Sequence, residues 1–190
     1  MGIIKKIVLG LAILLLLVSA IGLLFFSSHV EIRRSVTINR PVDEVFDYLN
    51  NLSNYNQWSP WYQMDTAAQY TFTGPVSGLG AKMSWVSKNE QVGQGSLVYT
   101  EVVEDKSIKH DLNFMENGVA KGEYVLEPTD EGTKVSWVFS FEAGANPLLR
   151  IMGSLMQDMV AADFDKGLAI MKGILESPAF IPESEEIEGC

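Results

Sequence analysis

The stretch SVTINRPVDEVFDYLNNLSNYNQWSPW, residues 35–61, joins the end of a strand to helical sequence. Polar and apolar residues alternate from about residue 30 to Pro41, which predicts an extended segment. After Pro41 the apolar residues take the i, i+3, i+4, i+7 spacing of one helix face, at Val42, Val45, Phe46 and Leu49. The chain therefore passes from a strand into a helix at this proline.

Trp58 and Trp61 stand on either side of Ser59 and Pro60 at the end of this stretch. Because a proline pushes the residue before it toward extended backbone, a second short helix should end near Trp58. The two indoles then lie at a corner of the chain, where each needs a place to bury its large apolar area. We expect Trp58 to lie in the core and Trp61, beyond the break, to line or rim a pocket.

Six further strand patterns follow between residues 69 and 143, and the turns between them are short, which predicts an antiparallel meander. A long helix comes next, with Asn146 as its N-cap and Pro147 in its first turn. It is the only predicted element large enough to cover the apolar face of the sheet. Three methionines cluster on this helix, which suits an irregular apolar ligand as well as ordinary core packing: Met152, Met156 and Met159.

The N-terminal run IVLGLAILLLLVSAIGLLFF, residues 7–26, carries no charge. As a helix it would span about 30 Å, the thickness of a bilayer core. A cleaved signal peptide is the alternative, with a cleavage site at residues 18–20, but the apolar run continues past that point and cleavage would expose it. We therefore expect a retained membrane anchor.

The charges that flank this run bear on its orientation. Lys5 and Lys6 favour a cytoplasmic N-terminus, while Arg33 and Arg34 beyond the other end weaken that bias. We expect a single-pass protein of a bacterial cytoplasmic membrane, with its domain on the extracytoplasmic side. The chain then divides into an anchor with a juxtamembrane segment at 1–29, one domain at 30–176 and an acidic, disordered tail at 177–190.

The chain is acidic, with a formal net charge of −10. Such a surface repels phosphate backbones, so nucleic acid is not an expected partner. The only cysteine is the last residue, Cys190, which excludes an internal disulfide and a thiol nucleophile within the fold. The two histidines, His29 and His110, do not form a cluster of metal ligands in the sequence, and we expect no metal and no cofactor.

Two polar residues fall in phase with apolar strand positions and are the weak candidates for catalysis. His110 could act as a general base or orient a ligand, and its structural alternative is an inert, hydrogen-bonded histidine at the end of a strand. Arg34 could clamp a ligand carboxylate, and its structural alternative is a pair with an acidic side chain, because an unpaired buried guanidinium would be very costly. The sequence shows no second catalytic group for His110.

The opening stretch, residues 35–61, resembles the start of the polyketide cyclase/dehydrase and lipid-transport branch of the START-like superfamily, also called SRPBCC. The segments GPVSGLGAKMSWVS, VGQGSLVYTEV, GTKVSWVF and DFDKGLAIMKGIL are similar to later parts of the same branch, so the resemblance covers about residues 30–176. It implies an α+β helix-grip fold, in which a curved antiparallel sheet of about seven strands wraps a long C-terminal helix. Two short helices are expected between the first two strands. No catalytic signature is among the matching segments.

Members of this superfamily bind lipids, sterols, polyketides or other hydrophobic molecules between sheet and helix, and some are enzymes. The resemblance therefore implies a membrane-tethered binding or carrier domain for a lipid- or polyketide-like molecule held in a cavity between the sheet and the C-terminal helix, although a fold does not fix an activity. One alternative is a cyclase/dehydrase-type enzyme that uses His110, Arg34 or a tyrosine such as Tyr99 or Tyr124 in the same cavity. A second is a protein-interaction module without a ligand. The residues expected to bind the ligand are Trp61, Trp85, His110, Tyr124, Trp137, Phe139, Met152, Met156 and Met159.

Overall fold

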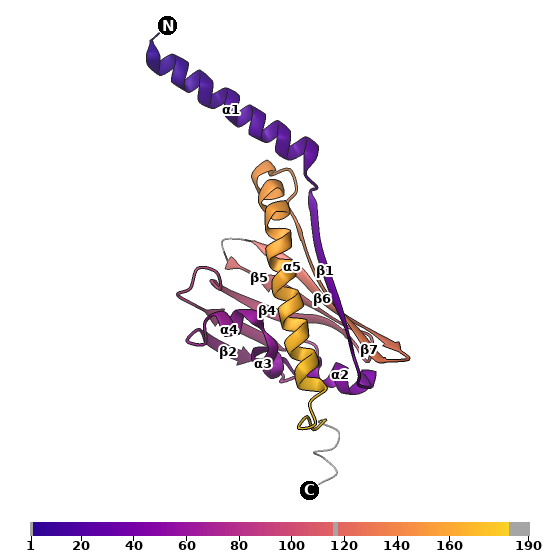
Figure 1. The fold of residues 1–190 in the computed structure, drawn as a ribbon. Coiled ribbons are helices and arrows are strands. Elements are labelled where there is room, and N and C mark those ends of the chain that lie inside the picture. Colours follow the sequence, from indigo (N-terminus) through magenta and orange to yellow (C-terminus); the bar gives the residue numbers. More distant parts are fainter. Residues whose placement is uncertain (1, 116–117, 183–190) are drawn as a thin grey trace.

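The computed structural model describes residues 2–115 and 118–182, and Figure 1 shows its elements. The chain begins with an apolar helix, α1 (Ile3–Phe25). The first strand and four short helical segments follow: β1 (His29–Ile38), α2 (Val42–Asn50), η1 (Leu52–Asn54), α3 (Tyr55–Trp58) and α4 (Pro60–Met64). Six strands and one long helix complete the fold: β2 (Gln69–Thr73), β3 (Lys82–Val86), β4 (Gln94–Val103), β5 (Ser107–Asn113), β6 (Val119–Thr129), β7 (Gly132–Glu142) and α5 (Pro147–Leu175).

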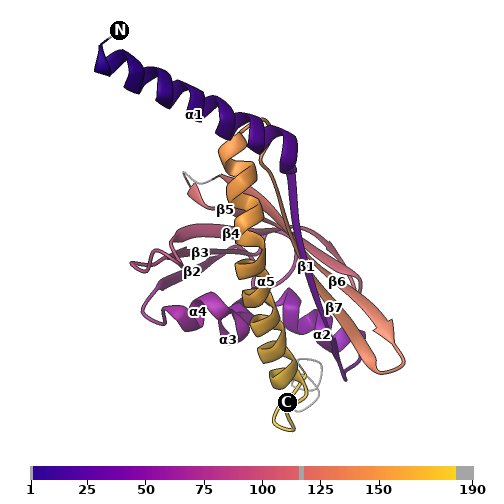
Figure 2. The ribbon, with the colours of Figure 1, turned by 45° about the horizontal axis from the view of Figure 1, so that its top comes forward.

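The seven strands form one antiparallel sheet in the order β1-β7-β6-β5-β4-β3-β2. From β2 to β7 each strand pairs with its neighbour in sequence, so the predicted meander is confirmed. β1 pairs with β7 along its whole length, from His29 opposite Glu142 to Ile38 opposite Thr133. The helices between β1 and β2 carry the chain from one edge of the sheet to the other (Figure 2).

The second helix predicted between β1 and β2 corresponds to two short segments, η1 and α3, and it ends at Trp58 as the sequence predicts. Trp61, expected on irregular chain beyond the break, instead lies in a further short helix, α4, because Ser59 and Pro60 start a new helix there. The side chain of Ser59 caps α4 by accepting the backbone N–H of Tyr62 at 3.4 Å, and Pro60 occupies the first helical position, where its missing N–H costs nothing.

α5 lies along the inner face of the curved sheet (Figures 1 and 2). Asn146 caps its start, because its side chain accepts two backbone N–H groups of the first turn. Two glycines let the helix approach the sheet closely. A Cβ atom at Gly153 would lie 2.6 Å from the ring of Phe141, and one at Gly167 would lie 3.0 Å from the ring of Trp137.

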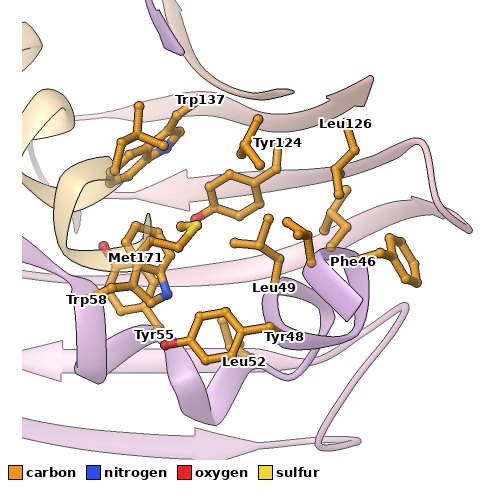
Figure 3. Close-up of a cluster of buried hydrophobic side chains, with 14 of the residues drawn as sticks. Phe46, Tyr48, Leu49, Leu52, Tyr55, Trp58, Tyr124, Leu126, Trp137 and Met171 are labelled. Atoms are coloured by element: carbon orange, nitrogen blue, oxygen red, sulfur yellow. The ribbon is translucent and has the colours of Figure 1, made fainter. Parts of the chain in front are cut away.

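The core lies between the sheet, the short helices and the C-terminal half of α5 (Figure 3). Trp58 of α3 meets Trp137 of β7 edge-on, with ring centroids 5.0 Å apart. Trp137 in turn stacks on Phe164 of α5 at 3.9 Å and 9°. Aromatic rings packed in this way contribute large apolar area and a preferred geometry, so this cluster holds helix and sheet together.

The two ends of the chain lie outside this core. α1 has a mean hydropathy of 3.0 and is long and apolar enough to cross a membrane, a property it would share with a signal sequence. Beyond α5, Phe180 packs edge-on against Tyr48 of α2 with centroids 5.9 Å apart, and the guanidinium of Arg40 lies 5.3 Å from the same ring. The rest of the predicted acidic tail, residues 183–190, lies outside the described residues.

Candidate ligand-binding site

The two halves of α5 differ sharply in exposure. In the C-terminal half, four large apolar side chains are buried in the core: Phe164, Leu168, Met171 and Leu175. In the N-terminal half, six apolar side chains are exposed: Leu148, Leu149, Met152, Leu155, Met156 and Met159. Met156 is 47% exposed and Met159 63%, against 1% for Phe164. A contiguous exposed apolar surface indicates a binding site more often than a contribution to stability.

The methionines that the sequence singles out form one flank of α5, called here the Met flank: Met152, Met156 and Met159. Asp165 lies on another side of the helix, which faces the β1 edge because its Oδ2 atom is 3.3 Å from Nε of Arg34. At about 3.6 residues per turn the Met flank lies away from that edge, toward α4 and strands β2–β5. The position of Gly167, nearer to this flank, agrees, since its Cβ would lie 3.1 Å from Pro60 at the start of α4.

The inner face of the sheet shows the same gradient of exposure as α5. Trp137 faces α5 because it stacks on Phe164, and Phe139 faces the same way because side chains alternate along a strand. Trp137 is buried, whereas Phe139 is only partly buried. On β5 the change falls between His110, which is buried, and Leu112, which is partly exposed. We call this region, where α5 leaves inward-facing residues uncovered, the open half of the helix–sheet interface.

Two small, buried residues of β6, Gly122 and Ala120, border the open half on the inner face of the sheet. Gly122 pairs with His110 on one side and with Phe139 on the other, and Ala120 pairs with Leu112. The ring of His110 brings its Nε2 atom close to this glycine, where a Cβ would be only 2.0 Å from Nε2. The imidazole of His110 therefore occupies the space above Gly122, next to Phe139.

The two tryptophans of the opening stretch take different positions. Trp58 is buried in the core, as predicted. Trp61 is only partly buried and meets Trp137 edge-on at 5.7 Å and Phe164 at 6.2 Å. It therefore lies at the boundary between the closed core and the Met flank, which is compatible with the predicted place at the rim of a pocket.

His110 and Tyr124 form a buried polar pair, with ring centroids 4.9 Å apart. Nδ1 of His110 and the hydroxyl of Tyr124 have no hydrogen-bond partner among the described residues. Burial is the main cause that lowers the pKa of His110 to about 3, and the backbone of Ile108 and the charge of Asp111 oppose it only in part. A histidine with this pKa is neutral at physiological pH and is a weak base. Figure 3 shows Tyr124 among the apolar side chains of the core.

The two tyrosines considered for catalysis are also held in unreactive states. The hydroxyl of Tyr99 donates to the carbonyl oxygen of Leu49 at 2.7 Å. Burial raises the pKa of Tyr99 and that of Tyr124 above the ordinary value for a phenol. Neither hydroxyl is therefore prepared to exchange a proton near neutral pH.

Two further predicted site residues, Arg34 and Trp85, lie away from the open half. Arg34 is paired with Asp165 on the β1 side of α5, which is the structural alternative to a ligand clamp. Trp85 is buried in β3, where its indole N–H donates to the carbonyl oxygen of Val92 at 3.1 Å and its ring meets Phe114 edge-on. The structure thus places Met152, Met156, Met159 and Phe139 at the open half, Trp61 at its boundary, and His110, Tyr124 and Trp137 in the adjoining core.

Two features escape the sequence-based prediction. Phe114, which follows β5 and is partly exposed, belongs with the apolar residues of this sheet face, and its phase with His110 was the signal for it. A hollow of about 700 Å³ lies not at the open half but at the other end of α5, between α2 and the segment after α5. Tyr48, Gln57 and Phe180 are among its lining residues. This hollow depends on how residues 177–181 fold back, and no sequence motif predicts the path of that segment.

An antiparallel sheet that grips a long C-terminal helix defines the helix-grip class of START-like, or SRPBCC, proteins. Residues 29–176 match the family described as polyketide cyclase / dehydrase and lipid transport, so the chain belongs to that family. The matched range ends with α5 and leaves α1 outside. A comparison with curated proteins finds no match.

Solved structures share the fold at low sequence identity. Protein CV1439 from Chromobacterium violaceum is 16% identical with a TM-score of 0.57, and the match covers 78% of this chain and 99% of that one. Protein SA2116 from Staphylococcus aureus, described as of unknown function, is 15% identical with a TM-score of 0.59 and coverages of 78% and 94%. The di-domain ARO/CYC protein StfQ of the steffimycin biosynthetic pathway is 13% identical with a TM-score of 0.60, and the match covers 78% of this chain and 51% of StfQ. These likenesses establish the fold.

Proposed function

We propose that the chain is a membrane-tethered binding or carrier domain for a hydrophobic small molecule, lipid- or polyketide-like, that lies against the open half of the helix–sheet interface. The Met flank is the observation that carries this proposal. Three flexible apolar side chains are left exposed on the side of α5 that faces strands β2–β5, and Phe139 of the sheet is left partly uncovered. Family membership supports the same class of ligand.

Apolar contact would supply most of the affinity at such a site. Burial of apolar area contributes about 25 cal/mol per Å², and methionine adapts its shape to irregular chains. The groups nearest in the core, His110 and Tyr124, would supply at most a polar handle at the inner end. A long hydrocarbon chain or a fused-ring molecule with few polar groups therefore suits the open half better than a sugar or a nucleotide.

The tether in this proposal is α1, retained as a single membrane span with the domain on the extracytoplasmic side. Its length and composition support a span. A hydrophobic ligand is dilute in water and concentrated in the membrane. A tether keeps the carrier domain beside that membrane and so raises the effective concentration of ligand that the domain meets.

The enzyme alternative is less well supported by the geometry. It would need His110 to take up a proton near neutral pH, and burial lowers its pKa to about 3. Arg34 is engaged by Asp165 and faces the β1 edge rather than the Met flank. We therefore place ligand binding before catalysis.

Native mass spectrometry tests the proposal on the intact chain extracted gently from its membrane. We expect a bound hydrophobic molecule on the parent and its loss in a Met156→Lys variant. Ala169→Lys is the matched control, because Ala169 is an exposed residue of α5 in the half where the core is closed. A parent without a bound molecule that also fails to bind a fluorescent fatty-acid probe would contradict the proposal, and so would equal losses in both variants.

A further inference from the structure

An apolar stripe runs along α5 further from the sheet than Met156. At about 3.6 residues per turn its members share one side of the helix: Leu148, Leu155 and two members of the Met flank, Met152 and Met159, which lie between these leucines and Met156. Leu155 is 73% exposed, the most of these residues. Between Pro147 and Gln157 the helix carries one charge, Arg150. We call these four residues the outer stripe.

The start of α5 is joined to the end of α1. Gly22 is buried against Pro147, where a Cβ atom would lie 2.6 Å from the proline carbonyl oxygen. Arg150 donates from Nη1 to the carbonyl oxygens of Leu23 at 3.1 Å and Phe26 at 3.3 Å. The last carbonyl groups of a helix lack partners within that helix, and Arg150 satisfies two of them at this end. The first turn of α5 therefore lies level with the end of the apolar helix.

Charged and apolar residues are separated at this end of the molecule. His29, Glu31 and Arg33 alternate with the buried Val30 and Ile32 of β1, so they lie on the outer face of the sheet. The two basic residues pair with acidic side chains of the same face, since the His29 ring lies 2.7 Å from the carboxylate of Glu142 and Arg33 Nε lies 3.5 Å from that of Glu31. The polar groups of the junction are thus gathered on the β1 side, away from the outer stripe.

The direction of α1 places its apolar surface near the exposed apolar side of α5. In both views α1 crosses the start of α5 and extends over the side on which β2–β5 lie (Figures 1 and 2). The Met flank and the outer stripe face that same side. Whatever apolar medium surrounds the exposed length of α1 therefore reaches the beginning of α5 as well.

We infer that the outer stripe docks on the surface of the bilayer that holds α1, an inference that rests on the proposed function because it takes α1 to be a retained anchor. The occupant of the stripe is the boundary between lipid headgroups and acyl chains, where apolar helix faces insert to a depth of about 5–10 Å. The stripe is uncharged, so docking would depend on the burial of apolar area and not on attraction to anionic lipid. Docking sets the open half of the helix–sheet interface beside the source of its ligand.

The depth of insertion should decrease along the helix. Leu148 is within one turn of the contact with α1, whereas Met159 lies about 16 Å further along the helix axis. A residue such as Ala169, exposed but in the distant half of α5, should stay in water. This gradient separates docking on a flat bilayer from burial of the whole helix in a second protein.

The test uses the full chain in phosphatidylcholine nanodiscs with Cys190→Ser and one fluorescent label at a new cysteine. The positions are Leu14 in α1, Leu148 and Leu155 in the stripe, and Ala169 as control. Quenching by nitroxide-labelled lipid should be strong at position 14, clear at 148, weaker at 155 and absent at 169, and high salt should not change it. The double variant Leu148→Glu and Leu155→Glu, labelled at position 152, should lose several-fold of its quenching with an unchanged melting temperature.

Contrary outcomes separate this inference from the function on which it rests. A label at position 14 that is not quenched would remove the tether, and docking with it. Quenching at 14 with labels at 148 and 155 no more quenched than at 169 would overturn docking alone. Cross-links between two stripes without quenching would assign the surface to a second copy and overturn docking. A docked chain that binds no fatty-acid probe would keep the inference and remove the carrier function.

Discussion

Met156 and Met171 are the same residue type on the same helix, and their surroundings are opposite. Met171 lies in the C-terminal half of α5, called here the closed half because the short helices and the aromatic cluster cover it, and is fully buried. Met156 lies where α5 has passed those elements, and nearly half of its surface is exposed. The difference arises from what lies opposite each turn of α5, because α2 and α3 cover only one end of the curved sheet.

This comparison separates the residues that hold the fold from those left available for a ligand. An apolar stripe on a helix predicts that something apolar covers it, and in the closed half the cover is the protein itself. In the open half the cover must come from outside the domain. The predictions that follow measure how well the two halves can be separated, from the largest expected effect to the smallest.

Substitution of Phe164 should have the largest effect on stability. Phe164→Ala removes the ring that stacks on Trp137 and should lower the free energy of unfolding by about 3–5 kcal/mol, the usual cost of a cavity in a packed core. Met156→Ala, on the same helix, should change it by about 0.5 kcal/mol or less, because the side chain is half exposed. Chemical denaturation of both variants measures the difference. Equal losses would mean that the open half is as much a part of the core as the closed half.

Trp61 tests the boundary between the halves. Trp61→Ala should weaken the binding of a fluorescent fatty-acid probe by about 1–3 kcal/mol, because a large apolar contact at the rim is lost. Its loss of stability should be smaller than that of Trp58→Ala, which empties a buried site and should cost about 3–5 kcal/mol. Probe titration and urea denaturation of the pair give both numbers. Unchanged probe affinity in Trp61→Ala would move the boundary away from Trp61.

The buried histidine predicts a pH dependence of stability. An unfolded histidine takes up a proton as the pH falls through about 6.5, whereas folded His110 stays neutral until about pH 3. Stability is therefore fully present above pH 6.5 and is lost as the pH falls toward 3, by about 2 kcal/mol between pH 7 and pH 5. His110→Phe should lack this part of the loss, and His29 is common to both chains. Urea denaturation of both chains at the two pH values checks the prediction. An equal loss of unfolding free energy in the parent and in His110→Phe would show that His110 is accessible to protons in the folded state.

Arg34 should show the smallest effect. Its pair with Asp165 is well exposed, so Arg34→Gln should cost about 0.2–1 kcal/mol of stability, less at high salt. The affinity for a fatty-acid probe should not change, because the residue faces the β1 edge. A large loss of affinity for probes with a carboxylate, and not for those without, would restore the ligand clamp that the sequence allowed.

The sequence was informative wherever a local pattern decides the structure. The change of periodicity at Pro41, the break at Ser59 and Pro60 and the cap at Asn146 predicted elements that the structure confirms. Each of these depends on residues within one or two turns. The division of α5 into two halves was not predictable, because it depends on which distant elements lie opposite each turn.

The candidate site shows the same limit. Phase along a strand placed His110 and Phe139 on the inner face, but not which of them the core would enclose. Arg34 was expected to need an acidic partner, yet its partner, Asp165, lies 131 positions away and no local pattern identifies it. Arg150, which joins α1 to the domain, carried no signal in the sequence because its acceptors are backbone carbonyls.

Site-mapped photo-cross-linking tests the central claim most directly. The full chain in nanodiscs would be irradiated with a photoactivatable fatty acid and the modified residues found by mass spectrometry. The account predicts adducts on Met156 and on Phe139, which a bilayer at the outer stripe does not reach. Adducts confined to Leu148 and Leu155 would leave only contact with the membrane, and adducts around Tyr48 and Phe180 would move the ligand to the hollow at the other end of α5. Either result would contradict a ligand site in the open half.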